Sequence, residues 1–122
     1  QWWWIRGLVF TGRLLHMIPI DEMVTVIVQE IHPERVYLFG SRATGRARAE
    51  SDLDLLVVEG EGFGPGRSRW RELQRIRKCL ARFRGAKDIL VYSLDEFEKW
   101  RNSVNHIISR AEREGKLLYE RS

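Results

Sequence analysis

The chain has 122 residues, of which 43% are hydrophobic and 31% charged, so it is typical of one globular domain and unlike a disordered or collagenous chain. Its single cysteine, Cys79, excludes an internal disulfide framework and favours a reducing compartment, and we therefore expect a cytoplasmic protein. The formal net charge is 21 − 17 = +4, and no apolar run approaches the ~20 residues needed to span a bilayer, so we expect no membrane association.

Residues 1–16 are expected to be an N-terminal extension outside the core, and residues 17–122 to form the folded domain. The extension carries Trp2, Trp3 and Trp4, three of the five tryptophans, and the first methionine of the chain is Met17. It lacks the long apolar stretch and the small-residue cleavage site of a signal peptide. A tryptophan anchor for a partner or a membrane surface is the alternative interpretation.

The first half of the chain predicts one helix and two buried strands. Residues 21–31 have a wide apolar face and are followed by Pro33, as expected of an amphipathic helix. Residues 35–39 and 53–58 are apolar at odd and even positions alike, which is typical of strands covered on both faces. Residues 40–51 are expected to form a polar loop, and residues 59–66 a second, glycine-rich loop.

The second half predicts three helices and two strands. Residues 67–84 place Trp70, Leu73, Ile76, Leu80 and Phe83 at helical spacing, and residues 87–92 form a third strand. Ser93 and Glu96 make a capping box that opens a short helix. Residues 103–114 form another amphipathic helix, ended by Gly115, and residues 116–120 a last strand. This order predicts an α/β fold, with a small mixed β-sheet packed against helices.

The segment 67–84 concentrates the positive charge of the chain. It contains eight basic residues and one acid, Glu72. Such a segment is most often the solvated face of an amphipathic helix. The alternative is a surface that attracts phosphates or an acidic partner.

Two carboxylates interrupt the apolar pattern of the second predicted strand. Asp52 and Asp54 are two residues apart, so an extended backbone directs both to one face, roughly 6–7 Å apart at Cα. Two like charges so close repel each other, and a divalent cation would compensate for this, with oxygen ligands favouring Mg²⁺ or Mn²⁺ over zinc. The alternative is that Asp52 caps a turn after Ser51 and Asp54 lies at an exposed edge.

Gly40, Ser41 and Arg42 directly follow the first predicted strand. The glycine allows close approach of the backbone to a ligand, the serine adds a hydroxyl, and the arginine a bidentate cation suited to phosphate. A simple strand-end turn is the alternative. A phosphate-binding turn and a metal-binding pair are the two halves of a phosphoryl-transfer site.

Asp88 opens the third strand and would lie beside Asp54 if the two strands are neighbours. There it could complete a second metal position or accept a proton.

The chain contains Gly40-Ser41 and, after ten intervening residues, Asp52-Leu53-Asp54-Leu55. This pattern resembles the signature of the DNA polymerase beta-like nucleotidyltransferases. Within that superfamily, the short chain resembles the minimal nucleotidyltransferases (MNT), and the resemblance covers about residues 20–120. It implies a nucleotidyltransferase (polymerase beta palm-like) fold, with metal ligands at Asp52 and Asp54 and a third acid at Asp88. In this family the third acid binds the catalytic metal and helps to deprotonate the acceptor, and the resemblance implies the same role for Asp88. The resemblance also implies a phosphate-binding turn at Gly40 and Ser41, with Arg42 matching an arginine often found there.

The same resemblance implies a Mg²⁺-dependent enzyme that transfers AMP from ATP to a protein partner. Members of this family are commonly antitoxins encoded beside a helical toxin of the higher-eukaryote-and-prokaryote nucleotide-binding (HEPN) type. The chain leaves too few residues beyond this core for a polymer-binding domain, so nucleic acid is not expected as the direct substrate. The alternatives are an antitoxin that acts by binding alone and nucleotidyl transfer to a small molecule such as an aminoglycoside. Homo-oligomers and hetero-oligomers are both compatible with these interpretations.

Overall fold

The computed structural model describes residues 19–45, 52–103 and 106–122. The predicted extension 1–16 lies outside these residues. The elements in chain order are α3 (Ile20–Ile31), β1 (Arg35–Phe39), α4 (Ser41–Thr44), β2 (Leu53–Glu59), α5 (Arg69–Cys79), β3 (Lys87–Ser93), α6 (Leu94–Trp100), α7 (Ile107–Glu114) and β4 (Lys116–Glu120). The strands form one mixed sheet in the order β3-β2-β1-β4, in which β2 and β3 are parallel and the other neighbours antiparallel. The predicted α/β fold with a small mixed sheet is confirmed.

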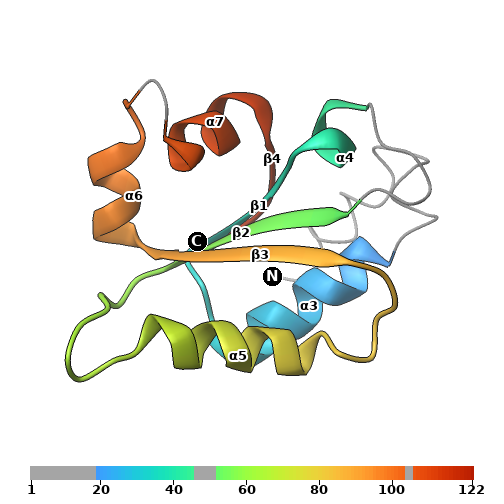
Figure 1. Ribbon diagram of the computed structural model, residues 1–122, viewed down its shortest axis with the longest axis horizontal. Coiled ribbons are helices and arrows are strands. Elements are labelled where there is room, and N and C mark those ends of the chain that lie inside the picture. The colour runs from blue at the N-terminus through green and yellow to red at the C-terminus, as the bar shows by residue number, and fades with distance from the viewer. Residues whose placement is uncertain (1–18, 46–51, 104–105) are drawn as a thin grey trace.

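Helices cover both faces of the sheet, α3 and α5 on one side and α6 and α7 on the other (Figure 1). Leu55 and Val57 of β2 pack into the cluster that contains α3 and α5 residues, whereas Leu56 and Val58 pack with Phe97 of α6. Successive side chains of a strand point to opposite faces, so both faces of β2 are apolar. This arrangement explains why residues 53–58 are hydrophobic at every position except Asp54.

Two helices are shorter than the ranges that the pattern predicts, and one of them, α7, begins at Ile107 and not at residue 103, with His106 as its N-cap. Helix α5 begins only at Arg69, where the Ser68 hydroxyl accepts a hydrogen bond from the Arg71 amide at 3.2 Å, and it ends at Cys79. The assignment of Trp70 to the apolar stripe is wrong, since its side chain is 60% exposed. At 3.6 residues per turn, Trp70 lies roughly 120° around the helix from the buried Ile76, and so it points away from the sheet.

Part of the predicted loop 40–51 is also helical, because residues 41–44 form the short helix α4. The backbone amides of Ala43 and Thr44 both donate to the Gly40 carbonyl oxygen, at 3.1 and 3.3 Å. A single helical turn has no apolar periodicity from which it could be predicted. Residues 46–51 of that loop, and residues 104–105 of the helix predicted over 103–114, lie outside the described part of the chain. Within the ranges that the structure describes, no helix combines the length and apolar character needed to cross a membrane.

Glu59, the last residue of β2, is a buried carboxylate at the end of the strand far from Asp54. Its Oε1 accepts a hydrogen bond from Arg67 Nη2 at 2.6 Å, while its buried Oε2 has no hydrogen-bond partner among the described residues. Burial, and then the neighbouring Glu72 carboxylate, raise the pKa of Glu59 from 4.5 to about 8, against the opposing effect of Arg67. Glu59 and Glu72 therefore form an acid pair in which one proton is retained near neutral pH.

We expect Glu59→Gln to reduce the loss of stability as the pH rises. Because the folded pKa of Glu59 is about 8 and its unfolded value 4.5, the folded chain binds the extra proton between these values, and unfolding becomes easier as the pH rises through that window. Glutamine has the same shape and never ionises, so the variant should match the wild type at pH 5 and melt about 5 °C higher at pH 9. Thermal unfolding at both pH values measures this. The matched control is Glu61→Gln, a 77% exposed side chain that also pairs with Arg67, and it should keep the wild-type pH dependence. A wild-type melting temperature that does not fall between pH 5 and 9 would contradict the prediction.

Candidate active site

Three side chains lie in one row across the sheet where β1 ends. Phe39 is the register partner of Asp54 across the antiparallel β1–β2 pair, and Asp54 is the register partner of Asp88 across the parallel β2–β3 pair. All three share the strand positions of residues that pack beneath α6 and α7, such as Leu56 and Leu90. Asp88 therefore lies beside Asp54, as expected if their strands are neighbours.

The three predicted acids are not gathered equally. Asp54 is half-buried, whereas Asp88 and Asp52 are exposed, and Asp52 precedes the first residue of β2. Among the residues that the structure describes, no group of three or more His, Cys, Asp or Glu side chains is assembled closely enough to hold a metal ion. The structure thus brings Asp54 and Asp88 together. Asp52 lies two residues before Asp54 along the chain and just outside β2.

Gly40 lies directly against Asp54. Its φ is +75°, in the left-handed region, and a Cβ built on it would lie 2.2 Å from Asp54 Oδ2 and 3.1 Å from Asp54 Cγ. No side chain larger than hydrogen fits there without displacing the carboxylate. The turn and the carboxylate of Asp54 are consequently parts of one site. Carboxylate oxygens are donors of the type that Mg²⁺ and Mn²⁺ prefer, so the chemistry of Asp54 and Asp88 fits a divalent cation, while the described side chains do not form a complete ligand set.

Ser41 and Arg42 form the start of α4, immediately after Gly40. The backbone of this turn is held by hydrogen bonds to the Gly40 carbonyl, including one from Thr44 Oγ1 at 3.4 Å. The predicted phosphate-binding residues therefore adjoin the predicted metal ligands at one end of the sheet. The side chains of Ser41 and Arg42 are outside what the structure describes.

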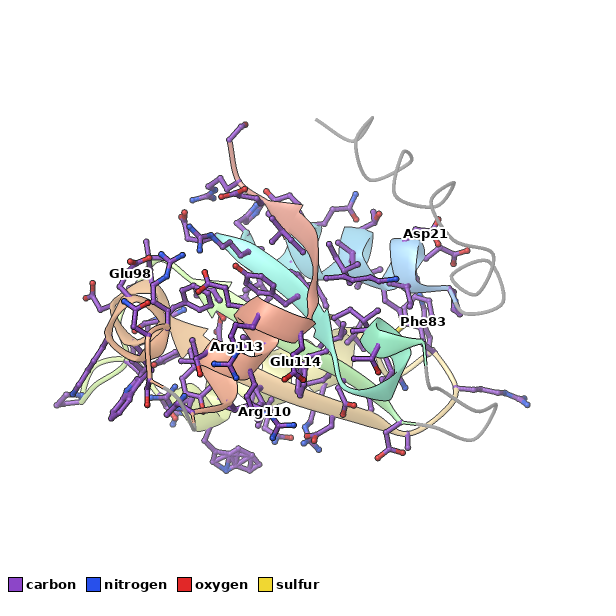
Figure 2. All side chains as sticks on the ribbon, turned by 90° about the horizontal axis from the view of Figure 1, so that it is seen from above. Asp21, Phe83, Glu98, Arg110, Arg113 and Glu114 are labelled. Carbon is purple, nitrogen blue, oxygen red and sulfur yellow. The ribbon has the colours of Figure 1, made fainter. Side chains whose placement is uncertain are left out.

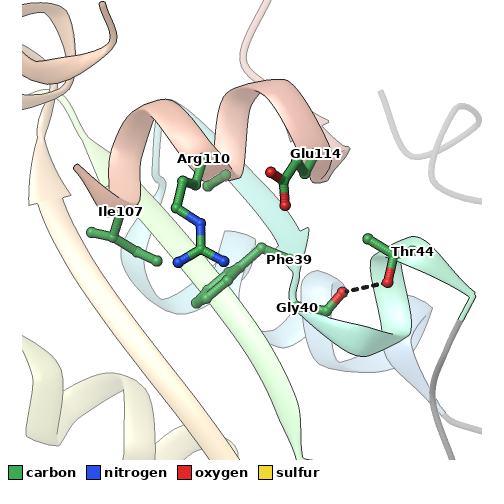
Figure 3. A pocket seen from close by; sticks show the side chains of 7 residues that line it. Phe39, Gly40, Thr44, Ile107, Arg110 and Glu114 are labelled. Atoms are coloured by element: carbon green, nitrogen blue, oxygen red, sulfur yellow. Dashed lines mark hydrogen bonds between the residues drawn. The ribbon is translucent and has the colours of Figure 1, made fainter. Parts of the chain in front are cut away.

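A cavity of about 330 Å³ opens beside this turn, between α7, α4 and the end of β1 (Figure 3). Its size is within the range of small-molecule sites and about ten times the volume of one water molecule. Its walls combine aromatic, aliphatic and ionisable side chains. The lining residues are Phe39, Gly40, Thr44, Ile107, Arg110, Ala111 and Glu114. The cavity thus extends from α7 to Phe39, the register partner of Asp54, and to Gly40, which lies against the Asp54 carboxylate.

The protein family described as "Polymerase beta, Nucleotidyltransferase" matches residues 22–122. The chain belongs to this family. The family prediction made from the spacing of Gly40-Ser41 and Asp52-Leu53-Asp54 is confirmed. A comparison with curated protein sequences finds no significant match.

Solved structures share the fold of this nucleotidyltransferase. A putative nucleotidyltransferase from Sulfolobus solfataricus is 24% identical, with a TM-score of 0.55 over 82% of this chain and 79% of that one. A toxin–antitoxin crystallised with AMP-PNP is 19% identical, with a TM-score of 0.55 over 84% and 73% of the two chains. A mutant of the toxin–antitoxin MntA–HpeT is 19% identical, with a TM-score of 0.52 over 84% and 72%. These likenesses confirm the predicted polymerase beta-like nucleotidyltransferase fold.

Helix α7 of this nucleotidyltransferase is held firmly over the candidate site. Ile108 and Ala111 are buried in the cluster that contains Leu56 and Phe97. At the start of the helix, His106 Nδ1 accepts a hydrogen bond from the Ile108 amide at 3.1 Å. Further along α7, Glu112 forms an ion pair at 2.5 Å with Arg101, the residue that follows α6. The α7 wall of the cavity is therefore anchored by packing, a cap and an ion pair.

The sequence motifs did not identify Arg110 and Glu114, which line the cavity from α7 (Figure 2). They follow Ile107 by three and seven residues, which places them on one side of a helix. That spacing could have grouped them, but nothing local to residues 103–114 indicates that this side of the helix faces the predicted acids.

Proposed function

We propose that this chain is a metal-dependent nucleotidyltransferase that transfers AMP from ATP to a protein partner, a helical toxin of the HEPN type, and so acts as its antitoxin. The observation that supports it most is the juxtaposition of Asp54, Asp88 and the Gly40 turn in a chain of this family. The choice of ATP and of a toxin partner draws on fold neighbours described as toxin–antitoxins, one of them with AMP-PNP.

On the donor side, the carboxylates of Asp52 and Asp54 would hold Mg²⁺ or Mn²⁺. The cation supplies charge neutralisation for the triphosphate, because carboxylates and phosphates otherwise repel each other. The backbone amides of Gly40 and Ser41 bind phosphate oxygens, and Arg42 adds a positive charge to the same turn. The protein thereby positions the nucleotide donor and stabilises the negative charge of its phosphates. Positioning and charge stabilisation are most of what catalysis of phosphoryl transfer requires.

On the acceptor side, Asp88 receives the proton of the attacking hydroxyl. The acceptor oxygen forms a bond to the α-phosphorus, the bond from that phosphorus to the oxygen bridging to the β-phosphate breaks, and pyrophosphate leaves. Asp88 suits this role because it is exposed at the start of β3, beside the half-buried Asp54. A hydroxyl of a partner protein can reach such an exposed carboxylate.

The decisive test is label transfer to a co-expressed helical protein of the HEPN type, the partner that the proposal requires. The two proteins are co-purified and incubated with Mg²⁺ and ATP labelled at the α-phosphate, and we expect covalent label and a mass increase of one AMP on the partner. ATP labelled at the γ-phosphate and samples with EDTA serve as controls and should leave the partner unlabelled. Neutralisation of the partner with no change in its mass would instead support an antitoxin that acts by binding alone.

A further inference from the structure

Arg110 of α7 extends into the cavity beside the candidate active site. Figure 3 shows its guanidinium between Ile107 and Phe39, on the side of the helix that faces the sheet. It is the single basic residue among the seven that line the cavity. Glu114, at the i+4 position where a helical ion pair commonly forms, also lines the cavity.

Among the described residues, the Arg110 guanidinium has no hydrogen-bond or ion-pair partner. Several other arginines of the chain do have carboxylate partners, and α7 itself carries one such carboxylate, that of Glu112, which pairs with Arg101. The arginines with ion pairs are Arg35, Arg67, Arg69, Arg75, Arg101 and Arg121. Arg110 is exposed and thus presents a planar cation to the cavity, with donors that no other described residue occupies.

The cavity and the candidate active site share a wall. Phe39 and Gly40 line the cavity, Phe39 is the register partner of Asp54, and Gly40 lies against the Asp54 carboxylate. A ligand that contacts the Gly40 turn is therefore within the space that Arg110 enters. In the proposed function a cation neutralises the carboxylates of Asp52 and Asp54, which leaves the phosphate oxygens of the nucleotide as the anions that match the fork of N–H donors of Arg110.

We infer that Arg110 is a nucleotide-binding residue, which donates hydrogen bonds from α7 to phosphate oxygens of the nucleotide bound at the Gly40 turn. The inference rests on the proposed function, because that function supplies the nucleotide. It assigns to α7 a part in substrate binding that the sequence motif, which ends before this helix, does not contain. The nucleotide is held from two sides, by the turn after β1 and by Arg110 opposite.

Calorimetric titration with Mg²⁺ and the non-hydrolysable analogue AMP-PNP measures this contact without turnover. Removal of a hydrogen-bonded cation should weaken binding by about 10- to 100-fold in Arg110→Ala. Arg110→Lys keeps the charge without the fork and should recover part of the affinity. The matched control is Arg113→Ala, which removes the same charge from a position of the same helix that is exposed, as Arg110 is, but does not line the cavity. It should bind AMP-PNP within about twofold of the wild type, and all variants should keep the wild-type melting temperature.

The outcomes separate this inference from the proposed function. Wild-type affinity in Arg110→Ala, or an equal loss in Arg113→Ala, would overturn the role of Arg110 and leave the proposed nucleotidyl transfer standing. A wild-type chain that binds no AMP-PNP in the presence of Mg²⁺ would overturn both. Selective loss in Arg110→Ala, with partial recovery in Arg110→Lys, supports the contact to the phosphates.

Discussion

Replacement of Asp54 by asparagine should abolish nucleotidyl transfer while the protein stays folded. Asp54 lies at the centre of the site, between the Gly40 turn and Asp88. Asparagine keeps the shape but loses the negative charge that a divalent cation requires. Loss of a metal ligand removes several kcal/mol of transition-state stabilisation, so the transfer rate should fall by about 10³-fold or more. Binding of AMP-PNP in the presence of Mg²⁺ should weaken in parallel.

Asp88→Asn is the informative companion to this variant. If Asp88 serves the acceptor, the variant should keep most of the affinity for AMP-PNP and Mg²⁺ and lose about 10²- to 10⁴-fold in rate, the usual effect of removing a general base. Asp95→Asn, at an exposed position in the first turn of α6, controls for the change in net charge and should leave both quantities unchanged. If the wild type binds the nucleotide equally well in Mg²⁺ and in EDTA, the proposed metal site is contradicted. Wild-type transfer by Asp88→Asn would reassign Asp88 to a structural role.

Gly40→Ala should have the second-largest effect, because one methyl group would occupy the position of the Asp54 carboxylate. The new Cβ would lie 2.2 Å from Asp54 Oδ2, so the carboxylate must rotate or the turn must shift. The φ of +75° adds a backbone cost of about 1–2 kcal/mol for any L-residue other than glycine. We expect a fall in transfer of about 100-fold, together with a melting temperature lower by about 5–10 °C.

The chain offers a matched control that separates backbone strain from displacement of Asp54. Gly45 also has a left-handed φ, +79°, but a Cβ built on it would have no heavy atom within 4 Å. Gly45→Ala should therefore lose stability to a similar degree and keep transfer close to the wild-type rate. If the two variants lose activity equally, strain in the turn and not the contact with Asp54 is responsible.

Much of the fold is predictable because its signals are local. The strands over residues 35–39 and 53–58 are apolar on both faces, and the structure covers both faces with helices. The capping box at Ser93 and Glu96 is present, with the Ser93 amide donating to Glu96 Oε1 at 2.9 Å and the Glu96 amide to Ser93 Oγ at 3.2 Å. Where the local signal is weak the prediction differs, as for the one-turn helix α4 and the exposed Trp70.

The residues of the candidate site likewise include some that the sequence indicates and some that only the structure reveals. Two carboxylates two residues apart, and a glycine at the end of a strand, are properties of short segments, so the spacing from Gly40 to Asp54 identifies the family without a structure. The roles of these residues stay predictions. The buried carboxylate of Glu59 had no sequence signal, because an acid at the end of a strand is usually solvated, and only the tertiary structure buries it beside Glu72. Burial and Glu72 together raise the pKa of Glu59 to about 8.

The sequence alone therefore determined the family, the order of the strands and of the longer helices, and the spacing of Gly40 and the acids, since each depends on residues that are neighbours along the chain. The tertiary structure decided which acids meet and what faces them. Asp54 and Asp88 are separated by the whole of α5 and become adjacent through the parallel pairing of β2 with β3. Arg110 enters the same space because packing of Ile108 and Ala111 places α7 over the sheet. Both arrangements result from the sum of many weak contacts between distant residues, and no short stretch of sequence contains that sum.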